Sequence, residues 1–220
     1  MIRPGVTTGE LEEFADDYIR RCGVKSAFKG YMGYPAHLCA SLNEGVVHGI
    51  PSRKRVVQNG DILSIDFGVF KDGYYGDAAK TFAVGEIDPK SARLIEVTEK
   101  SLYAGIEAAK PGKRVGDISS AVQTLVEAAG FSVVRDFVGH GIGKSMHEEP
   151  QVPNFGCGGT GPVLYPGMTI AIEPMVNAGG YEVRVMSDGW TVLTRDGSRS
   201  AHFEHTIVVT EYGNEILSVV

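Results

Sequence analysis

The sequence predicts an α+β fold in which one structural unit occurs twice along the chain. Positions 60–66 read GDILSID and positions 167–173 read GMTIAIE, so the carboxylates that end the two strings, Asp66 and Glu173, are 173 − 66 = 107 residues apart. The same separation relates Gly23 to Gly130. A helix pattern and a strand pattern therefore recur in the same order, as expected for a duplicated unit.

The helices of the two units are predicted to end at equivalent glycines. The first begins at Thr7 or Thr8, because Thr7 and Glu10 have the spacing of a capping box, and Gly23 ends it. Its apolar face is predicted to hold Leu11, Phe14, Tyr18 and Cys22. The second helix spans about 116–129 before Gly130. Its core face is predicted to hold Ile118, Val122, Leu125 and Ala129.

A longer helix and several strands complete the predicted elements. Asp88 and Pro89 have the pattern of a helix start, and the Pro111-Gly112 pair ends this helix near Lys110. Strands are predicted at 62–70, 74–84, 169–176, 182–187, 190–195 and 203–210.

Composition limits the possible classes of function. The chain has 220 residues, of which 43% are hydrophobic and 22% charged, which suits one domain with a sizeable core. Its net charge of −6 argues against sequence-specific nucleic-acid binding, which needs a basic face. The three cysteines lack CxxC spacing, and no apolar run is long enough for a signal core or a membrane span. We therefore expect free thiols, no membrane partner and a cytoplasmic location.

The first predicted hairpin carries two carboxylates on one face. With Lys71-Asp72-Gly73 as a type I turn and Gly73 in the left-handed region, Asp66 is predicted to pair directly with Asp77. Cβ atoms about 5 Å apart would bring like charges together unless a cation or a shared proton compensates. Two solvated acids on a surface hairpin would also fit this spacing. The repeat favours the cation, because Glu173 falls on the equivalent face.

Three further residues could join such a site. Glu204 lies in the last strand, AHFEHTIVVT, where a buried carboxylate calls for a cation, whereas an edge strand would leave it solvated. His140 stands between two glycines and His147 follows seven residues later. Each histidine could be a metal or substrate ligand or a hydrogen-bonded structural residue.

Five segments together resemble the type I methionine aminopeptidases, which have the pita-bread, creatinase-like fold. They read VVHGIPS, DGYYGDAAKTF, FVGHGIGKSMHEEP, MTIAIEPM and FEHTIVVT. The resemblance implies a pseudo-twofold duplicated unit whose antiparallel curved sheet is covered by helices on one face. It also implies a single catalytic domain over 1–220, with the internal repeat at roughly 4–85 and 111–210. Family members usually carry an extra helix before the segment that begins here at Pro4, so either a trimmed start or a naturally short form is expected.

The resemblance also implies a site with two divalent metal ions, which could be Co, Mn, Fe or Zn. The implied ligands are Asp66, Asp77, His140, Glu173 and Glu204, with Asp77 and Glu204 bridging the two ions. Glu173 would also shuttle a proton, His147 would bind the scissile carbonyl oxygen, and His48 would contact the substrate near its scissile amide. The implied apolar pocket for methionine consists of Tyr31, Tyr34, Cys39, Met146 and Trp190. Phe28 stands where the family has a smaller residue.

The function implied by this site is removal of the initiator methionine from nascent polypeptides whose second residue is small. A hydroxide held by the two metals would attack the peptide bond. The implied enzyme is a monomer that meets its substrate at the ribosome.

Two other functions remain open at this level. Proline-specific peptidases share the fold and the five ligands, although they usually carry a separate N-terminal domain. A non-catalytic pita-bread module that binds peptides would be expected to lose some ligands. Cleavage of Met-Ala-Ser, cleavage of Ala-Pro, or no cleavage after metal reconstitution would separate the three.

Overall fold

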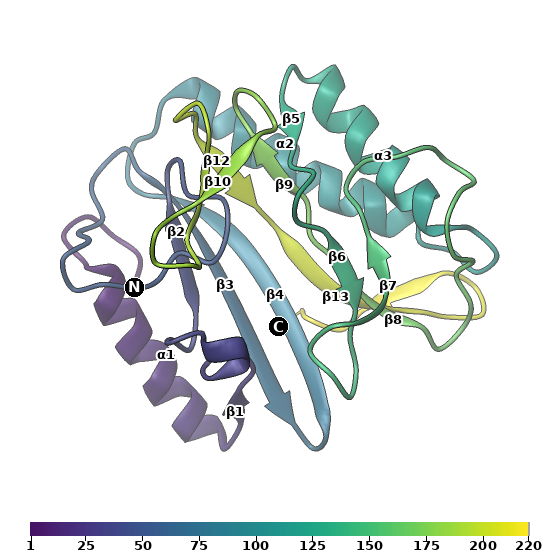
Figure 1. Cartoon of the computed structure of the whole chain (residues 1–220), viewed down its shortest axis with the longest axis horizontal. Helices are drawn as coiled ribbons and strands as arrows, with labels where there is room; N and C mark the ends of the chain where they lie inside the picture. The colour runs from purple at the N-terminus through teal and green to yellow at the C-terminus, as the bar shows by residue number, and fades with distance from the viewer. Residues whose placement is uncertain (220) are drawn as a thin grey trace.

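The computed structural model describes residues 1–219, which fold around one antiparallel sheet of nine strands (Figure 1). The strand order is β1-β3-β4-β13-β8-β6-β7, with β2 paired to β3 and β14 paired to β13. Two smaller sheets, β10-β11 and β12-β9-β5, lie beside it. The strands of the main sheet are β1 Lys25–Ser26, β2 Cys39–Leu42, β3 Ile62–Lys71, β4 Tyr74–Ala83, β6 Gly139–Gly141, β7 Glu148–Val152, β8 Thr169–Ile172, β13 Glu204–Val209 and β14 Asn214–Ile216. Those of the smaller sheets are β5 Ser132–Val133, β9 Met175–Asn177, β10 Val183–Val185, β11 Val192–Thr194 and β12 Ser200–His202.

Three α-helices pack against the sheet, and a short 3₁₀ helix spans Tyr31–Gly33. Helix α1 lies along β3 at one end of the molecule, whereas α2 and α3 lie together at the other (Figure 1). Their bounds are α1 Thr8–Cys22, α2 Pro89–Ala108 and α3 Val115–Ala128. The structure confirms all three predicted helices, including the capping box between Thr7 and Glu10.

The predicted apolar face of α1 is wrong. Its buried residues are Thr8, Leu11, Ala15 and Ile19, while Phe14 and Tyr18 are 45% and 50% exposed. Leu11 belongs to both the predicted and the observed buried face. The observed face is rotated by about one residue from the face that Phe14 and Tyr18 indicate. Phe14 and Tyr18 instead stack on each other on the outer surface.

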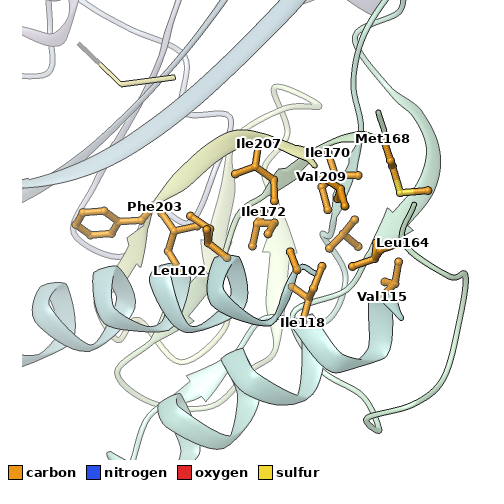
Figure 2. Close-up of a cluster of buried hydrophobic side chains, with 13 residues drawn as sticks. Leu102, Val115, Ile118, Leu164, Met168, Ile170, Ile172, Phe203, Ile207 and Val209 are labelled. Carbon is orange, nitrogen blue, oxygen red and sulfur yellow. The ribbon is translucent and has the colours of Figure 1, made fainter. Parts of the chain in front are cut away.

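The largest part of the core lies between the helix pair and the middle of the sheet. Figure 2 shows Leu102 of α2 and Ile118 of α3 beside Ile172 of β8 and Ile207 of β13. Along β13 the odd-numbered residues face this core, which leaves the even-numbered Glu204 on the opposite face. The helices therefore cover one face of the sheet and leave the other free for a site.

The hairpin of β3 and β4 differs in register from the prediction. Asp72 and Gly73 both have positive φ, 51° and 90°, so the loop is a two-residue type I′ turn. Asp77 consequently pairs with Gly68, and Asp66 pairs with Ala79. The two carboxylates are diagonal neighbours rather than a direct pair, but they still share one face because the register moved by two residues.

The remaining strand predictions are confirmed in position and corrected in length. The predicted strand 169–176 is divided into β8 and β9, with Pro174 in the break, because proline cannot donate a hydrogen bond to a ladder. The strands predicted at 182–187, 190–195 and 203–210 are shorter, and β13 is an interior strand between β4 and β8.

The duplication is visible in equivalent element starts. Helix α1 begins at Thr8 and α3 at Val115, and strand β3 begins at Ile62 and β8 at Thr169; each pair is 107 residues apart (115 − 8 and 169 − 62). The glycines after the two helices, Gly23 and Gly130, both have positive φ.

Candidate metal centre

The sheet face opposite the helices carries three buried carboxylates. Ala79 of β4 pairs with Asp66 on one side and with Glu204 on the other, and Asp77 lies two residues before it. The small Ala79 side chain leaves open space between the two acids, whose Cα atoms are roughly 10 Å apart across two strand spacings. Glu204 is only 2% exposed. The prediction that these carboxylates face a common interior is confirmed.

His140 brings a nitrogen ligand to the same place. Ligand atoms of Asp77, His140 and Glu204 lie within 4.8 Å of one another, and all three residues are buried. Nδ1 of His140 is 2.9 Å from the carbonyl oxygen of Gly141. Because a carbonyl only accepts, Nδ1 carries the proton and Nε2 keeps the lone pair that a metal needs.

Glu173 follows β8 and lies beside His140. Its backbone carbonyl accepts a 3.0 Å hydrogen bond from the buried amide of Asn154. Its Oε1 is 3.5 Å from Nε2 of His140, and its Oε2 is 3.8 Å from Nε2 of His202. Glu173 therefore lies on the same side of the sheet as the other three carboxylates, as the sequence repeat predicted.

The carboxylates destabilise one another in the absence of a cation. Burial raises the pKa values of Asp66, Glu173 and Glu204 well above their usual range, and the charge of Asp77 raises them further. Burial raises the pKa of Asp77 itself to about 7. Such shifts arise when acids share a site that water does not solvate.

The residues present fit a divalent cation. Asp66 Oδ1 and Glu204 Oε1 are buried and accept no hydrogen bond from any residue in 1–219. Buried acceptors without partners cost stability, and a cation supplies the missing interaction. Four carboxylates and one imidazole are typical ligands for first-row transition metals, so the donor set agrees with a metal site.

The carboxylates lie in the wall of a cavity of about 210 Å³. The cavity wall contains every residue that the sequence singled out: Tyr31, Tyr34, Cys39, His48, Asp66, Asp77, His140, Met146, His147, Glu173, Trp190 and Glu204. Residues from positions 31 to 204 therefore converge on one space.

The two further histidines flank the metal-ligand group. The ring of His147 lies 4.2 Å from that of His140, and the Tyr31 hydroxyl is 2.8 Å from its Nδ1. The His48 ring contacts Phe137 and Trp190 edge to face. Its backbone has a positive φ of 56°, a conformation that non-glycine residues rarely adopt. Burial lowers the pKa of His48 and of His140 to about 4 and also lowers that of His147, so all three are neutral near pH 7.

The other end of the cavity is apolar. Tyr34 and Trp190 meet edge to face, and Tyr34, Cys39 and Met146 belong to one buried cluster. The Tyr34 hydroxyl lies 3.1 Å from the carbonyl of Leu38 and 3.2 Å from that of Gly49, so it is satisfied away from the cavity. This end suits an unbranched apolar side chain of a ligand whose polar backbone lies at the carboxylates.

Phe28 forms part of this apolar wall and packs directly over β3. A Cβ added at Gly68 would lie 2.7 Å from Cε1 of Phe28 and 2.9 Å from Cβ of Ala27. Only glycine at position 68 allows the ring to lie this close to the sheet. The bulk of Phe28 is thus accommodated by the absence of a side chain beneath it.

Sequence reasoning did not assign several of the residues that line the cavity. These are Met32, Val47, Phe137, Val138, Met175 and His202. His202 is the most polar of them, and burial lowers its pKa to about 3. Its alternation with Glu204 and Thr206 along the last strand was the available signal, because it places all three on one face.

Comparison with known proteins agrees with this arrangement. The family model described as metallopeptidase family M24 matches residues 1–211. A methionine aminopeptidase of Clostridium acetobutylicum is 52% identical over 217 residues, which cover 99% of this chain and 87% of the relative. The crystal structure of a methionine aminopeptidase from Thermotoga maritima superposes with a TM-score of 0.98 at 51% identity, covering 100% of this chain and 88% of that one.

A more distant structure bears on the proline-specific alternative. An Xaa-Pro dipeptidase from Bacillus anthracis has a TM-score of 0.77 at 25% identity, and the match covers 100% of this chain but 54% of the dipeptidase. The fold is therefore shared, while the sequence lies much closer to the aminopeptidases. The pita-bread fold and the resemblance to type I methionine aminopeptidases are both confirmed. The chain belongs to metallopeptidase family M24.

Proposed function

We infer that this protein is a methionine aminopeptidase that removes the initiator methionine from polypeptides. The observation that carries this inference is 52% identity to such an enzyme over 99% of the chain, together with a cavity that joins buried metal-ligand residues to an apolar pocket. The preferred substrates are nascent chains whose second residue is small, as the resemblance to type I methionine aminopeptidases implies.

Asp66, Asp77, His140, Glu173 and Glu204 would hold two divalent cations. Support comes from the buried Asp77, His140 and Glu204 group and from the unpartnered oxygens of Asp66 and Glu204. When bound, the cations polarise the scissile carbonyl and make water a nucleophile near neutral pH. The cations can be Co, Mn, Fe or Zn, because this donor set does not select among them.

The chain's own residues divide the remaining work. Glu173 accepts the proton of the attacking water and returns it to the leaving amine. Neutral His147 donates a hydrogen bond to the carbonyl oxygen as negative charge develops there. Neutral His48 contacts the scissile amide, and the pocket of Tyr31, Tyr34, Cys39, Met146 and Trp190 holds the methionine side chain.

The same proposal covers the organisation and setting of the enzyme. Residues 1–220 form a single catalytic domain with an internal repeat at roughly 4–85 and 111–210, and this domain acts as a monomer in the cytoplasm on chains emerging from the ribosome. No helix within residues 1–219 has the length and apolarity needed to cross a bilayer.

A short peptide panel tests the activity. The protein is expected to release methionine from Met-Ala-Ser, to leave Leu-Ala-Ser and Ala-Pro intact, and to lose activity in a chelator. Cleavage of Ala-Pro would assign it to the proline-specific branch. Failure to cleave any peptide after metal reconstitution would indicate a binding module instead.

A further inference from the structure

The Glu173 carboxylate lies between two imidazoles that approach different oxygens. His140 Nε2 is 3.5 Å from Oε1, and His202 Nε2 is 3.8 Å from Oε2. Among residues 1–219, no other histidine, lysine or arginine nitrogen comes within 4.0 Å of this carboxylate. The two oxygens of one side chain thus have separate neighbours.

His202 is held rigidly at this position. Its backbone N–H donates to Thr81 Oγ1 at 2.8 Å, and its backbone carbonyl accepts from the same hydroxyl at 2.9 Å. Thr81 also bonds to Ser64, so the clamp joins β12 to both strands of the first hairpin. The side chain is 2% exposed. The backbone of His202 is therefore fixed to the first hairpin, and its side chain is enclosed in the cavity wall.

The Nε2 atom of His202 has no hydrogen-bond partner in the part of the chain that the structure describes. A buried polar atom without a partner destabilises the folded state, which a fold tolerates where the atom acts on a neighbour or ligand. Oε2 of Glu173 is the carboxylate oxygen that lies within 4.0 Å of it. A hydrogen bond between them requires the Glu173 side chain to move by roughly 0.8 Å, a small rotation for a side chain at a cavity surface.

We propose that His202 is a positioning residue whose Nε2–H donates to Oε2 of Glu173, which reserves Oε1 for the cation site beside His140. This inference rests on the proposed role of Glu173, which must bind a cation and exchange a proton. One carboxylate can do both only if its two oxygens are held in different places. Partners of this kind fix the orientation of metal ligands, and their loss typically weakens metal binding or activity by about 10–100-fold.

Two substitutions at position 202 separate hydrogen bonding from packing. His202→Phe keeps a ring but removes the donor, whereas His202→Gln keeps a donor at nearly the same reach. His205→Phe is the matched control, because His205 lies on the next strand with its ring against Ser218, on the face that does not line the cavity.

Each protein is depleted of metal, titrated with Co²⁺ by calorimetry and assayed on Met-Ala-Ser. His202→Phe is expected to weaken Co²⁺ binding and lower kcat by about 10–100-fold with little change in KM, while His202→Gln stays within about threefold of the unaltered protein. His205→Phe is expected to match the unaltered protein in both. Unchanged Co²⁺ binding and kcat in His202→Phe would overturn the proposal, and so would an equal defect in His202→Gln.

The tautomer of His202 in the unaltered protein provides a second test. In the Zn²⁺-loaded protein, two-bond ¹H–¹⁵N correlations of the histidine rings report which nitrogen is protonated, and the His202 signals are identified by comparison with His202→Gln. The Nε2–H tautomer is expected, and the Nδ1–H tautomer would refute the hydrogen bond. If the unaltered protein fails to cleave Met-Ala-Ser, the proposed function is wrong, yet the Co²⁺ titration and the tautomer still decide the role of His202.

Discussion

The hydroxyl of Tyr31 lies 2.8 Å from Nδ1 of His147, although 116 residues separate the two in the sequence. If the hydroxyl donates, the ring proton of His147 is on Nε2, the nitrogen that is free of Tyr31. With the hydroxyl as the donor, the contact favours the tautomer that can donate a hydrogen bond into the cavity. It also joins the short helix before β2 to the segment between β6 and β7.

Replacing His147 by alanine is expected to separate turnover from metal binding. His147→Ala should lower kcat for Met-Ala-Ser by about 10²–10³-fold, the usual cost of losing one donor to a developing oxyanion. Metal content, measured by elemental analysis, should not change. Tyr31→Phe should give a smaller loss, because the imidazole remains but its tautomer is no longer selected. Full activity in His147→Ala would contradict the assignment.

Replacing Asp77 by asparagine is expected to remove metal and activity together. Its carboxylate is buried beside His140 and Glu204, and a neutral amide supplies neither the charge nor a second equivalent oxygen. Asp72→Asn in the exposed turn of the same hairpin is the matched control, since asparagine also suits a positive φ. Metal content and kcat should fall in the first variant and persist in the second. Retention of both in Asp77→Asn would exclude it as a ligand.

The metal-depleted protein is expected to lose stability as the pH rises above about 7.5, where unfolded histidines no longer bind protons. The buried carboxylates have raised pKa values, so the folded state binds more protons than the unfolded state. Stability therefore falls from the unfolded pKa near about 4 up to the folded pKa of each group, which is about 7 for Asp77 and well above the usual range for Asp66, Glu173 and Glu204. Between about pH 5 and 7.5 the histidines with lowered pKa values act in the opposite direction, because only their unfolded forms are protonated there. The urea midpoint should be lower at about pH 8.5 than at about pH 7.5, and Mn²⁺ should raise it more at the higher pH. Equal midpoints with and without Mn²⁺ would contradict the site.

Substituting Gly68 is expected to disturb both stability and the methionine pocket. In Gly68→Ala the new methyl group would meet Phe28 at 2.7 Å and push its ring toward the cavity. Overpacking of this kind costs about 1–3 kcal/mol in the free energy of unfolding, and KM for Met-Ala-Ser should rise. Gly76→Ala in the paired strand is the control, because nothing lies within 4 Å of its Cβ position. Urea unfolding and initial rates of both variants measure the difference.

The sequence was sufficient to predict the main elements because their signals are local. The capping box of α1, the proline at the start of α2 and the periodic apolar residues each act within a few residues of themselves. The duplication added long-range information, since it related Glu173 to Asp66 without any knowledge of the fold.

The register of the first hairpin shows where local reasoning failed. The prediction assumed that Gly73 alone adopts a positive φ, but Asp72 does so too, which shortens the loop to two residues. A shift of two residues changes the partner of each carboxylate and preserves the face. The prediction that Asp66 and Asp77 share a face therefore holds despite the incorrect pairing.

The strands that carry His140 and His202 could not be predicted from their own sequences. Strands β6 and β12 have three residues each, Gly139–Gly141 and Ser200–His202, and neither triplet favours a strand by propensity. They exist because β8, β9 and other distant segments pair with them. The role of a residue such as His202 depends on those pairings and becomes visible only in three dimensions.

The division of the candidate ligands between the two halves has a consequence for the chain as a whole. Asp66 and Asp77 come from the first half, and His140, Glu173 and Glu204 come from the second. A nick in the connecting helix would therefore yield fragments that each hold an incomplete donor set. Neither fragment should retain a cation alone, and only their reassociation would restore one.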